Sequence, residues 1–292
     1  MYSSLVPIYA YAFFGSSRQL AVGPVAMVSL LLSTGLTMVL DNEGITKEGV
    51  GEEEYTAIYA TLALQTSVLV GLCYIVMGLL RLGFVTLFLS HAVVSGFTSA
   101  AAIIIGLSQV KYIFGYDIPN DKSLHGILKN IFSNIGQFNW KTFLLGTSCT
   151  MALVGLKKLA ARYPRMKWAR AAGPLLVTVI SIVLQATVDL EARGIPIVKH
   201  IPAGLPKFTG TIAFEETSTM GKLTVVVMSI VIVGFMESIA IAKKLAQVHG
   251  YELDSSMELM GLGMANLTSG LFGGYPVTGS FSRSAVNNSS GA

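Results

Sequence analysis

Charged residues are scarce in this sequence: only 12% of its 292 residues are Asp, Glu, Lys or Arg, about half the fraction in an ordinary soluble domain. Hydrophobic residues make up 52% of the chain, and the mean hydropathy is +0.64. This composition excludes a soluble globular domain and predicts an all-α, polytopic membrane protein. The net charge of +4 comes from basic residues spread through loops. We therefore expect no nucleic-acid partner.

Cysteine is equally rare, and the two that occur, Cys73 and Cys149, lie inside apolar runs. They are expected to be small core residues and not parts of a disulfide framework. The sequence also contains no cluster of metal ligands, no glycine-rich phosphate loop ending in Lys-Ser or Lys-Thr, and no hydrolase nucleophile elbow. We therefore expect no enzyme, no catalytic residues, no metal and no cofactor.

Apolar runs divide the chain into predicted membrane spans. Residues 1–14 are shorter than the ~20 residues that a crossing needs, so they predict the end of a span and a chain that is a fragment. The remaining predicted spans are residues 20–40, 55–79, 85–110, 142–156, 175–188, 222–245 and 255–272. The segments between them, including an acidic loop at 41–54 and polar loops at 111–138 and 189–219, are predicted to lie outside the membrane.

Small residues recur at every fourth position in two of these spans, which is typical of membrane helices that approach closely. The two stripes are Ala92, Gly96 and Ala100, and Gly261, Ala265 and Ser269. The last span is also predicted to start with a capping box, in which Ser255 caps the helix and Glu258 completes the box.

Glycine and proline interrupt the chain at two corresponding places. The first break is Gly23-Pro24, and because proline fits the first turn of a helix, Pro24 is predicted to begin one. The second break has four Gly or Pro residues within 273–279, before a helix at about Ser280. Paired half-helices are typical of the binding site of a secondary transporter. The alternative is that each break merely kinks a packed span.

Two ionisable residues lie where charge is costly. Arg283 directly follows the second break, and an arginine at membrane depth costs roughly 2.5–3.5 kcal/mol, so it is expected to line a cavity or an ion path. Glu237 is the only acidic residue that we place well inside a span, which predicts a functional role. His91 is instead expected to be a satisfied residue at a helix end, not a proton relay.

Four segments carry a resemblance to a known family: Val22-Gly-Pro-Val-Ala-Met-Val-Ser29, Gly96-Phe-Thr-Ser-Ala-Ala-Ala-Ile-Ile-Ile-Gly-Leu107, Glu237-Ser-Ile-Ala-Ile-Ala-Lys243 and Tyr275-Pro-Val-Thr-Gly-Ser-Phe-Ser-Arg-Ser-Ala-Val-Asn287. They resemble the sulfate permease (SulP) anion transporters, most closely the plant and algal members. The resemblance implies fourteen spans in two inverted seven-span repeats, with two broken half-helices meeting at the midplane. It also implies a dimer and a cytoplasmic STAS domain in the full-length protein.

The same resemblance implies that residues 1–292 are an incomplete transmembrane transport domain without a STAS domain. Residues 1–79 and 220–292 would be its core-type segments and residues 80–219 its gate-type segment. Its implied activity is secondary active sulfate transport by alternating access, with lipids as neighbours. We expect the plasma membrane as its location and an organellar membrane as the alternative.

Sulfate carries two negative charges, and two helix N-termini with one guanidinium supply about +2. Arg283 is therefore the predicted main anion partner, supported by hydroxyls and backbone amides at the two half-helices. These further predicted binding residues are Val25, Ala26, Ser280, Phe281 and Ser282. The alternatives are that Arg283 only pairs with a carboxylate such as Glu237, and that the serines only cap their own helix.

Moving a dianion inward against ~100 mV costs about 4.6 kcal/mol, so accumulation needs a coupled ion. The plant-like members of the family carry a glutamate assigned to proton coupling on the corresponding span, which implies proton symport with Glu237 as the proton carrier. The alternative for Glu237 is a fixed counter-charge to Arg283. Two other functions stay open: an anion exchanger or channel-like protein for chloride, bicarbonate or molybdate, and a non-transporting membrane scaffold.

Overall fold

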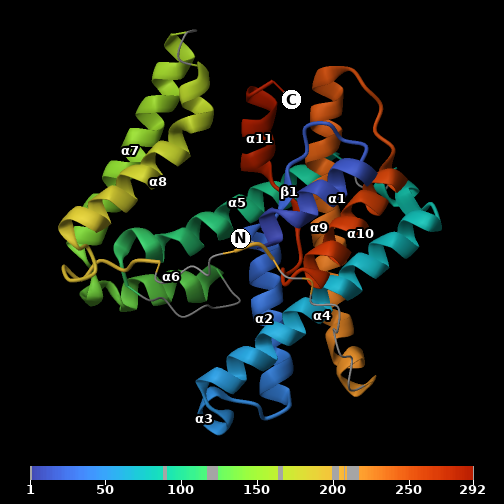
Figure 1. Ribbon diagram of the computed structural model, residues 1–292, viewed down its shortest axis with the longest axis horizontal. Coiled ribbons are helices and arrows are strands. Elements are labelled where there is room, and N and C mark those ends of the chain that lie inside the picture. Colours follow the sequence, from blue (N-terminus) through green and yellow to red (C-terminus); the bar gives the residue numbers. More distant parts are fainter. Residues whose placement is uncertain are drawn as a thin grey trace. The chain divides into compact units, whose positions relative to one another are not determined.

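The computed structural model describes residues 2–87, 91–116, 124–163, 167–198, 204–206, 208 and 217–291, and Figure 1 shows their helices and strands. In chain order the elements are η1 (Tyr2–Ser4), α1 (Val6–Phe14), β1 (Val22–Gly23), α2 (Ala26–Asn42), α3 (Lys47–Val50), α4 (Glu52–Leu79), η2 (Leu82–Leu87), α5 (His91–Phe114), α6 (Leu124–Ser133), η3 (Ile135–Gln137), α7 (Trp140–Arg162), α8 (Lys167–Val188), α9 (Thr217–His249), α10 (Ser255–Leu271), β2 (Thr278–Gly279) and α11 (Phe281–Ser289). They group into two compact units, one of Met1–Thr98 with Gly204–Ala292 and one of Ser99–Ala203.

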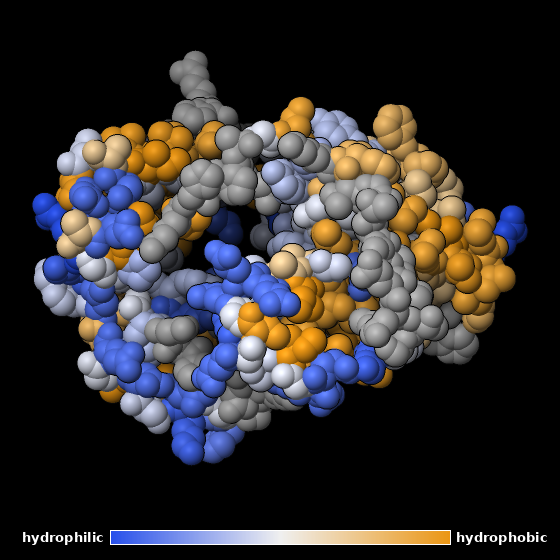
Figure 2. Space-filling view, turned by 60° about the horizontal axis from the view of Figure 1, so that its bottom comes forward, coloured by the Kyte–Doolittle hydropathy of each residue, from blue (hydrophilic) through white to orange (hydrophobic). Residues whose placement is uncertain are grey.

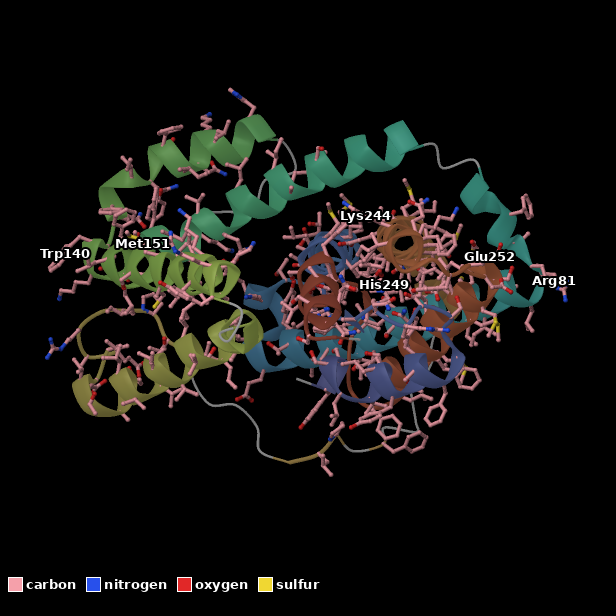
Figure 3. The ribbon with its side chains drawn as sticks, turned by 90° about the horizontal axis from the view of Figure 1, so that it is seen from above. Arg81, Trp140, Met151, Lys244, His249 and Glu252 are labelled. Carbon is pink, nitrogen blue, oxygen red and sulfur yellow. The ribbon has the colours of Figure 1, made fainter. Side chains whose placement is uncertain are left out.

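Several described helices suit a membrane. Segments of α4, α7 and α9 are long and apolar enough to cross one, namely Glu52–Leu79, Trp140–Ala160 and Gly221–His249. Large apolar side chains also remain exposed, as Figure 2 shows by its hydrophobic surface areas. Two of them, labelled in Figure 3, are Trp140 and Met151 on α7, which are 63% and 70% exposed. Lipid chains would cover such side chains, in agreement with the predicted polytopic membrane protein.

Helices α4 and α10 pack so closely that their backbones touch. A Cβ atom added at Gly71 on α4 would lie 2.5 Å from the Leu267 amide nitrogen, and one added at Gly263 on α10 would lie 3.0 Å from the Gly71 carbonyl oxygen. Small residues on both helices therefore permit the contact. The predicted stripe on α10 is confirmed as a packed face, because Ala265 and Ser269 are buried.

The other predicted stripe, on α5, has no such packing in the described part of the chain. A Cβ atom at Gly96 would meet nothing within 4 Å, and Ala100 is exposed. The side chain of Ala92 lies outside the described residues. Spacing alone cannot say whether a partner helix is present, and here none covers the described positions.

Three predicted boundaries were wrong. The predicted polar loop 111–138 contains the helix α6, while residues 117–123 of that loop lie outside the described residues. Helix α5 begins at His91, and the expected start at residue 85 falls in η2. The basic stretch after residue 156 continues α7 as far as Arg162. The first and third errors came from reading a polar stretch as a loop, although a polar or amphipathic stretch can remain helical. The second came from counting the apolar residues of η2 as part of the span.

The predicted capping box at the start of α10 was also wrong. Asp254 is the N-cap, and its carboxylate accepts hydrogen bonds from the amides of Ser256 (2.8 Å) and Met257 (3.2 Å). Ser255 is thus the first helical residue. Glu258 does not close a box but is fully buried, so Glu237 is not the only acidic residue buried within a helix of this chain.

The close approach of α4 and α10 generates the first prediction. Replacing Gly71→Ala forces the two backbones apart, and such overpacking costs roughly 1–3 kcal/mol. We expect a lower unfolding temperature of the purified chain in detergent. Gly221→Ala on α9 is the matched control, because a Cβ atom there meets nothing within 4 Å, and it should leave the unfolding temperature unchanged or slightly raised. Equal unfolding temperatures for the two variants would contradict the close contact.

Candidate functional site

The two interrupted segments meet in a two-stranded antiparallel sheet (Figure 1). Val22 in β1 lies opposite Gly279 in β2, and Gly23 lies opposite Thr278. The Ser280 amide continues the ladder by donating to the Ala21 carbonyl at 3.0 Å. Because α2 begins three residues after β1 and α11 begins two residues after β2, both helix N-termini start next to one small sheet.

Helix α2 begins at Ala26, with Val25 as an N-cap in extended conformation and no side-chain cap. The prediction that Pro24 begins the helix was therefore wrong. Pro24 stays in the extended segment, where its carbonyl oxygen is turned toward the second half-helix and accepts a hydrogen bond there. The uncapped amides that follow Val25 match the polarity needed for an anion.

Helix α11 begins at Phe281, close to the predicted start at Ser280. The Ser280 hydroxyl oxygen accepts a long hydrogen bond from the Arg283 amide, at 3.5 Å, and lies 3.4 Å from the Ser282 hydroxyl. Ser280 thus caps its own helix, which was one of the two roles considered for it from the sequence. Its hydroxyl hydrogen remains available, because a cap of this kind uses only the oxygen lone pair.

Arg283 connects the two half-helices. Its Nη1 donates to the Pro24 carbonyl oxygen at 2.8 Å, and a Cβ atom at Gly23 would lie 3.0 Å from its Nη2. The absence of a side chain at Gly23 therefore leaves room for the guanidinium. Among the described residues Arg283 makes this one side-chain hydrogen bond, and a guanidinium has five N–H donors. Most of its donors therefore have no partner among the described residues.

Glu237 is buried in α9, with 4% of its surface exposed. Its Oε2 atom has no hydrogen-bond partner in the described part of the chain. Within the described ranges the ion pair found within 4 Å joins Lys222 and Glu43 and does not involve Glu237. The contacts therefore lend no support to a fixed ion pair between Glu237 and Arg283.

The extended segment that precedes α11 is held by Asn266 of α10. The Asn266 side chain accepts from the Val277 amide at 2.8 Å and donates to the Val277 carbonyl oxygen at 2.9 Å. It therefore pairs with the extended backbone as a neighbouring strand would. Its amide also donates to the Leu262 carbonyl oxygen at 2.8 Å. Asn266 is fully buried, so every polar atom of this contact is satisfied inside the protein.

A second set of contacts ties β2 to α9. The Gly279 amide donates to the Ser238 hydroxyl at 2.9 Å, and the Thr278 hydroxyl donates to the Gly234 carbonyl oxygen at 2.7 Å. The two hydroxyls lie 2.7 Å apart. Because the Thr278 hydrogen is already used, the Ser238 hydroxyl must donate to Thr278. Glu237 precedes Ser238 on α9, so these hydrogen bonds tie the backbone that carries the buried carboxylate to β2.

Helix α11 is anchored at its sides as well. The Ser284 hydroxyl accepts from the Ala21 amide at 2.9 Å, and the Asn287 side chain donates to the Gln19 carbonyl oxygen at 3.2 Å. His249 at the end of α9, labelled in Figure 3, is hydrogen-bonded to Asn288. Sequence reasoning missed Asn266, Ser238 and Ser284. The one signal for Asn266 and Ser238 is a polar residue inside a largely apolar run, and Ser284 has no such signal.

The Asn266 contact generates the second prediction. Asn266→Leu leaves the buried Val277 amide and carbonyl unpaired, which costs roughly 1–3 kcal/mol for each group. We expect a lower unfolding temperature and faster hydrogen exchange at Val277. Thr268→Val is the control on the same helix, because the Thr268 hydroxyl bonds only to carbonyls of its own helix. If both variants exchange at the rate of the unsubstituted chain, Asn266 does not hold the segment.

Comparison with known proteins identifies the family. The Sulfate permease family matches residues 1–292. Over the whole chain, the sequence is 42% identical to "Probable sulfate transporter 4.2" of Arabidopsis thaliana, covering 41% of it, and 43% identical to "Sulfate transporter 4.1, chloroplastic" of the same plant, covering 40% of it. The chain thus spans about two fifths of these relatives. They are named as transporters, in agreement with the expectation that the chain is not an enzyme.

Two solved structures have the same fold. SLC26A9 matches 99% of this chain with 45% of its own, at a TM-score of 0.84 and 24% identity. The transmembrane domain of the cyanobacterial bicarbonate transporter BicA matches 99% of this chain with 69% of its own, at a TM-score of 0.73 and 22% identity. The chain is therefore an integral membrane protein that belongs to the sulfate permease family.

Proposed function

We propose that the protein is a secondary active sulfate transporter that holds the anion between the N-termini of α2 and α11. The observation that carries the proposal is the pairing of β1 with β2, which brings the N-termini of the two half-helices together. Arg283 of α11 links the two segments through its hydrogen bond to the Pro24 carbonyl oxygen, just before α2. The names of the two Arabidopsis thaliana relatives, both sulfate transporters, support sulfate as the anion.

The charge of this site suits a dianion. Two helix N-termini contribute about half a positive charge each and the guanidinium one more, which gives about +2. Donors are available at the amides of Val25, Ala26, Phe281 and Ser282. The hydroxyls of Ser280 and Ser282 share one hydrogen bond and add at least one more donor. Because these donors are fixed before the anion arrives, they can replace part of its hydration shell without reorganising. Desolvation of sulfate would otherwise be prohibitive.

Proton coupling through Glu237 follows from the same charge count. A charged Glu237 near the site would reduce about +2 to about +1, whereas a protonated Glu237 leaves the full charge for sulfate. Its buried Oε2 has no partner among the described residues, so an ionised carboxylate there is poorly compensated. We infer that the proton and the anion are bound together and cross the membrane together.

For alternating access, we propose residues 1–79 and 220–292 as the moving core and residues 80–219 as the gate. The proposed site residues all belong to the compact unit of Met1–Thr98 and Gly204–Ala292, so one unit carries all of them. We further propose a homodimer of the full-length protein, in contact with lipids. We propose the plasma membrane as the location. The alternative is an organellar membrane, which the word "chloroplastic" in the name of one relative supports.

The third prediction concerns Arg283. Arg283→Gln should weaken the binding of radiolabelled sulfate to the purified chain roughly 10- to 100-fold, because hydrogen bonds to a charged donor are lost. Arg283→Lys keeps the charge but not the forked geometry and should give an intermediate loss. The control is Lys244→Gln, which removes a positive charge from an exposed position on α9 (Figure 3). An equal loss in the control would mean that overall charge, not the site, attracts sulfate.

The fourth prediction concerns proton coupling. In cells that lack their own sulfate uptake, uptake by the full-length protein should rise as the external medium is acidified. Glu237→Gln keeps the shape of the side chain but cannot carry a proton, so uptake should become independent of external pH. Glu252→Gln, the same change at an exposed position (Figure 3), should retain the pH dependence. Uptake by Glu237→Gln that still depends steeply on acidity would remove Glu237 from this role.

The same experiments separate the rival functions. An anion exchanger or channel-like protein for chloride, bicarbonate or molybdate would lose sulfate uptake when chloride is removed, or would show no dependence on acidity. A non-transporting scaffold would not bind labelled sulfate at all. Sulfate transport coupled to protons requires binding, uptake without chloride, and a rise with external acidity.

A further inference from the structure

Glu258 is a second buried acidic residue, and the transport proposal does not use it. It lies in the first turn of α10 and is 0% exposed. Its Oε1 accepts from the amides of Ser16 (2.8 Å) and Ser17 (2.7 Å) and from the Ser16 hydroxyl (2.8 Å), and its Oε2 accepts from the Tyr11 hydroxyl (2.7 Å). The carboxylate is thus enclosed by four donors from one short stretch of chain.

These contacts suit the charged form of the side chain. All four partners donate, and a carboxylate is an acceptor at both oxygens. Hydrogen bonds to an ionised group are shorter and stronger than neutral ones. The N-terminus of α10 adds a favourable dipole. A buried charge is tolerated only with such compensation, so this contact would be costly to break.

The stretch that encloses Glu258 is the junction where α1 ends and the chain becomes irregular. Gly15 follows α1, and a Cβ atom added at Gly261 on α10 would lie 2.7 Å from the Gly15 Cα. A Cβ atom at Gly15 would itself lie 2.5 Å from the Tyr11 ring. Backbone packing therefore seats the same junction on α10 independently of the carboxylate.

The segment from Gly15 to Ala21, here called the linker, runs from this junction to β1. Its far end is bound to α11, where the Ala21 amide donates to Ser284 and the Gln19 carbonyl oxygen accepts from Asn287. The Tyr251 hydroxyl also donates to the Gln19 side chain at 2.8 Å. The linker is therefore fixed to α10 at its start and to α11 at its end. Its position determines where β1 and the start of α2 lie.

We propose that Glu258 is a positioning residue for the anion site: its carboxylate fixes the linker on α10 and thereby holds the α2 N-terminus opposite that of α11. The expected effect on sulfate affinity rests on the proposed function, whereas the contact between Glu258 and the linker does not depend on it. Glu258 does not touch the half-helix tips and acts only through the backbone that it binds.

The test, the fifth prediction, removes the carboxylate and then supplies one. Glu258→Gly, in the chain reconstituted in lipid nanodiscs, should speed hydrogen exchange across the linker about tenfold or more, since hydrogen bonds to a charged group are lost. Its dissociation constant for sulfate should rise by about the same factor. Added formate should restore both the slow exchange and the sulfate affinity, because its carboxylate can occupy the space that Glu258 leaves among the four donors. Glu258→Leu fills the same space with an apolar side chain, so it should show the same losses and formate should not reverse them.

Three controls make the outcome decisive. The unsubstituted chain with formate measures any competition between formate and sulfate. Asp254→Ala removes the neighbouring carboxylate that caps α10, and it should leave linker exchange nearly unchanged. If Glu258→Gly does not fold, Glu258→Gln replaces it: the amide keeps the shape but loses the charge, and linker exchange should still rise measurably.

Unchanged linker exchange in the Glu258 variants, a loss that formate does not reverse, or an equal effect of Asp254→Ala would each overturn the positioning role. If linker exchange responds as expected but sulfate affinity does not, Glu258 is structural only. If the unsubstituted chain does not bind sulfate, the proposed function fails, while the exchange data still decide whether Glu258 holds the linker.

Discussion

The structure depends on one constraint: a backbone that leaves its helix inside a membrane must find hydrogen-bond partners within the protein. The two interrupted segments meet this demand by pairing with each other in the β1–β2 sheet. The rest of the second segment is satisfied by side chains, chiefly Asn266 and Ser238. Each break therefore needs the other. The convergence of two helix N-termini, on which the proposed anion site rests, is a consequence of how the breaks are satisfied.

Helix α10 organises both breaks. Near its start Glu258 binds the linker that leads to β1, and further along Asn266 binds the segment that leads to β2. Its opposite contact, with α4, is so close that only glycine fits at Gly71 and Gly263. A helix locked in place by backbone contact is a rigid reference. Both half-helices are positioned against it, which explains how two short segments far apart in sequence can hold a fixed relative geometry.

The sequence predicted those parts of the site that have local causes. Gly and Pro near residues 23 and 276 marked the breaks, the end of the second Gly/Pro-rich segment marked the start of α11, and an arginine at membrane depth marked Arg283. It could not predict contacts that join residues more than 240 positions apart, such as Ser17 with Glu258. Glu258 was read as part of a capping box because that pattern needs only four neighbouring residues. Its true partners lie at the other end of the chain.

The two buried carboxylates show how environment separates roles. Glu258 accepts hydrogen bonds from four donors, so it can serve as a fixed anchor. Glu237 has an Oε2 without a partner among the described residues and no ion pair within 4 Å there, so no contact holds it in the ionised form. Acidic groups in such different surroundings commonly take different roles. The proposed coupling depends on the surroundings of Glu237, because a site of about +2 binds sulfate best when its neighbouring carboxylate is neutral.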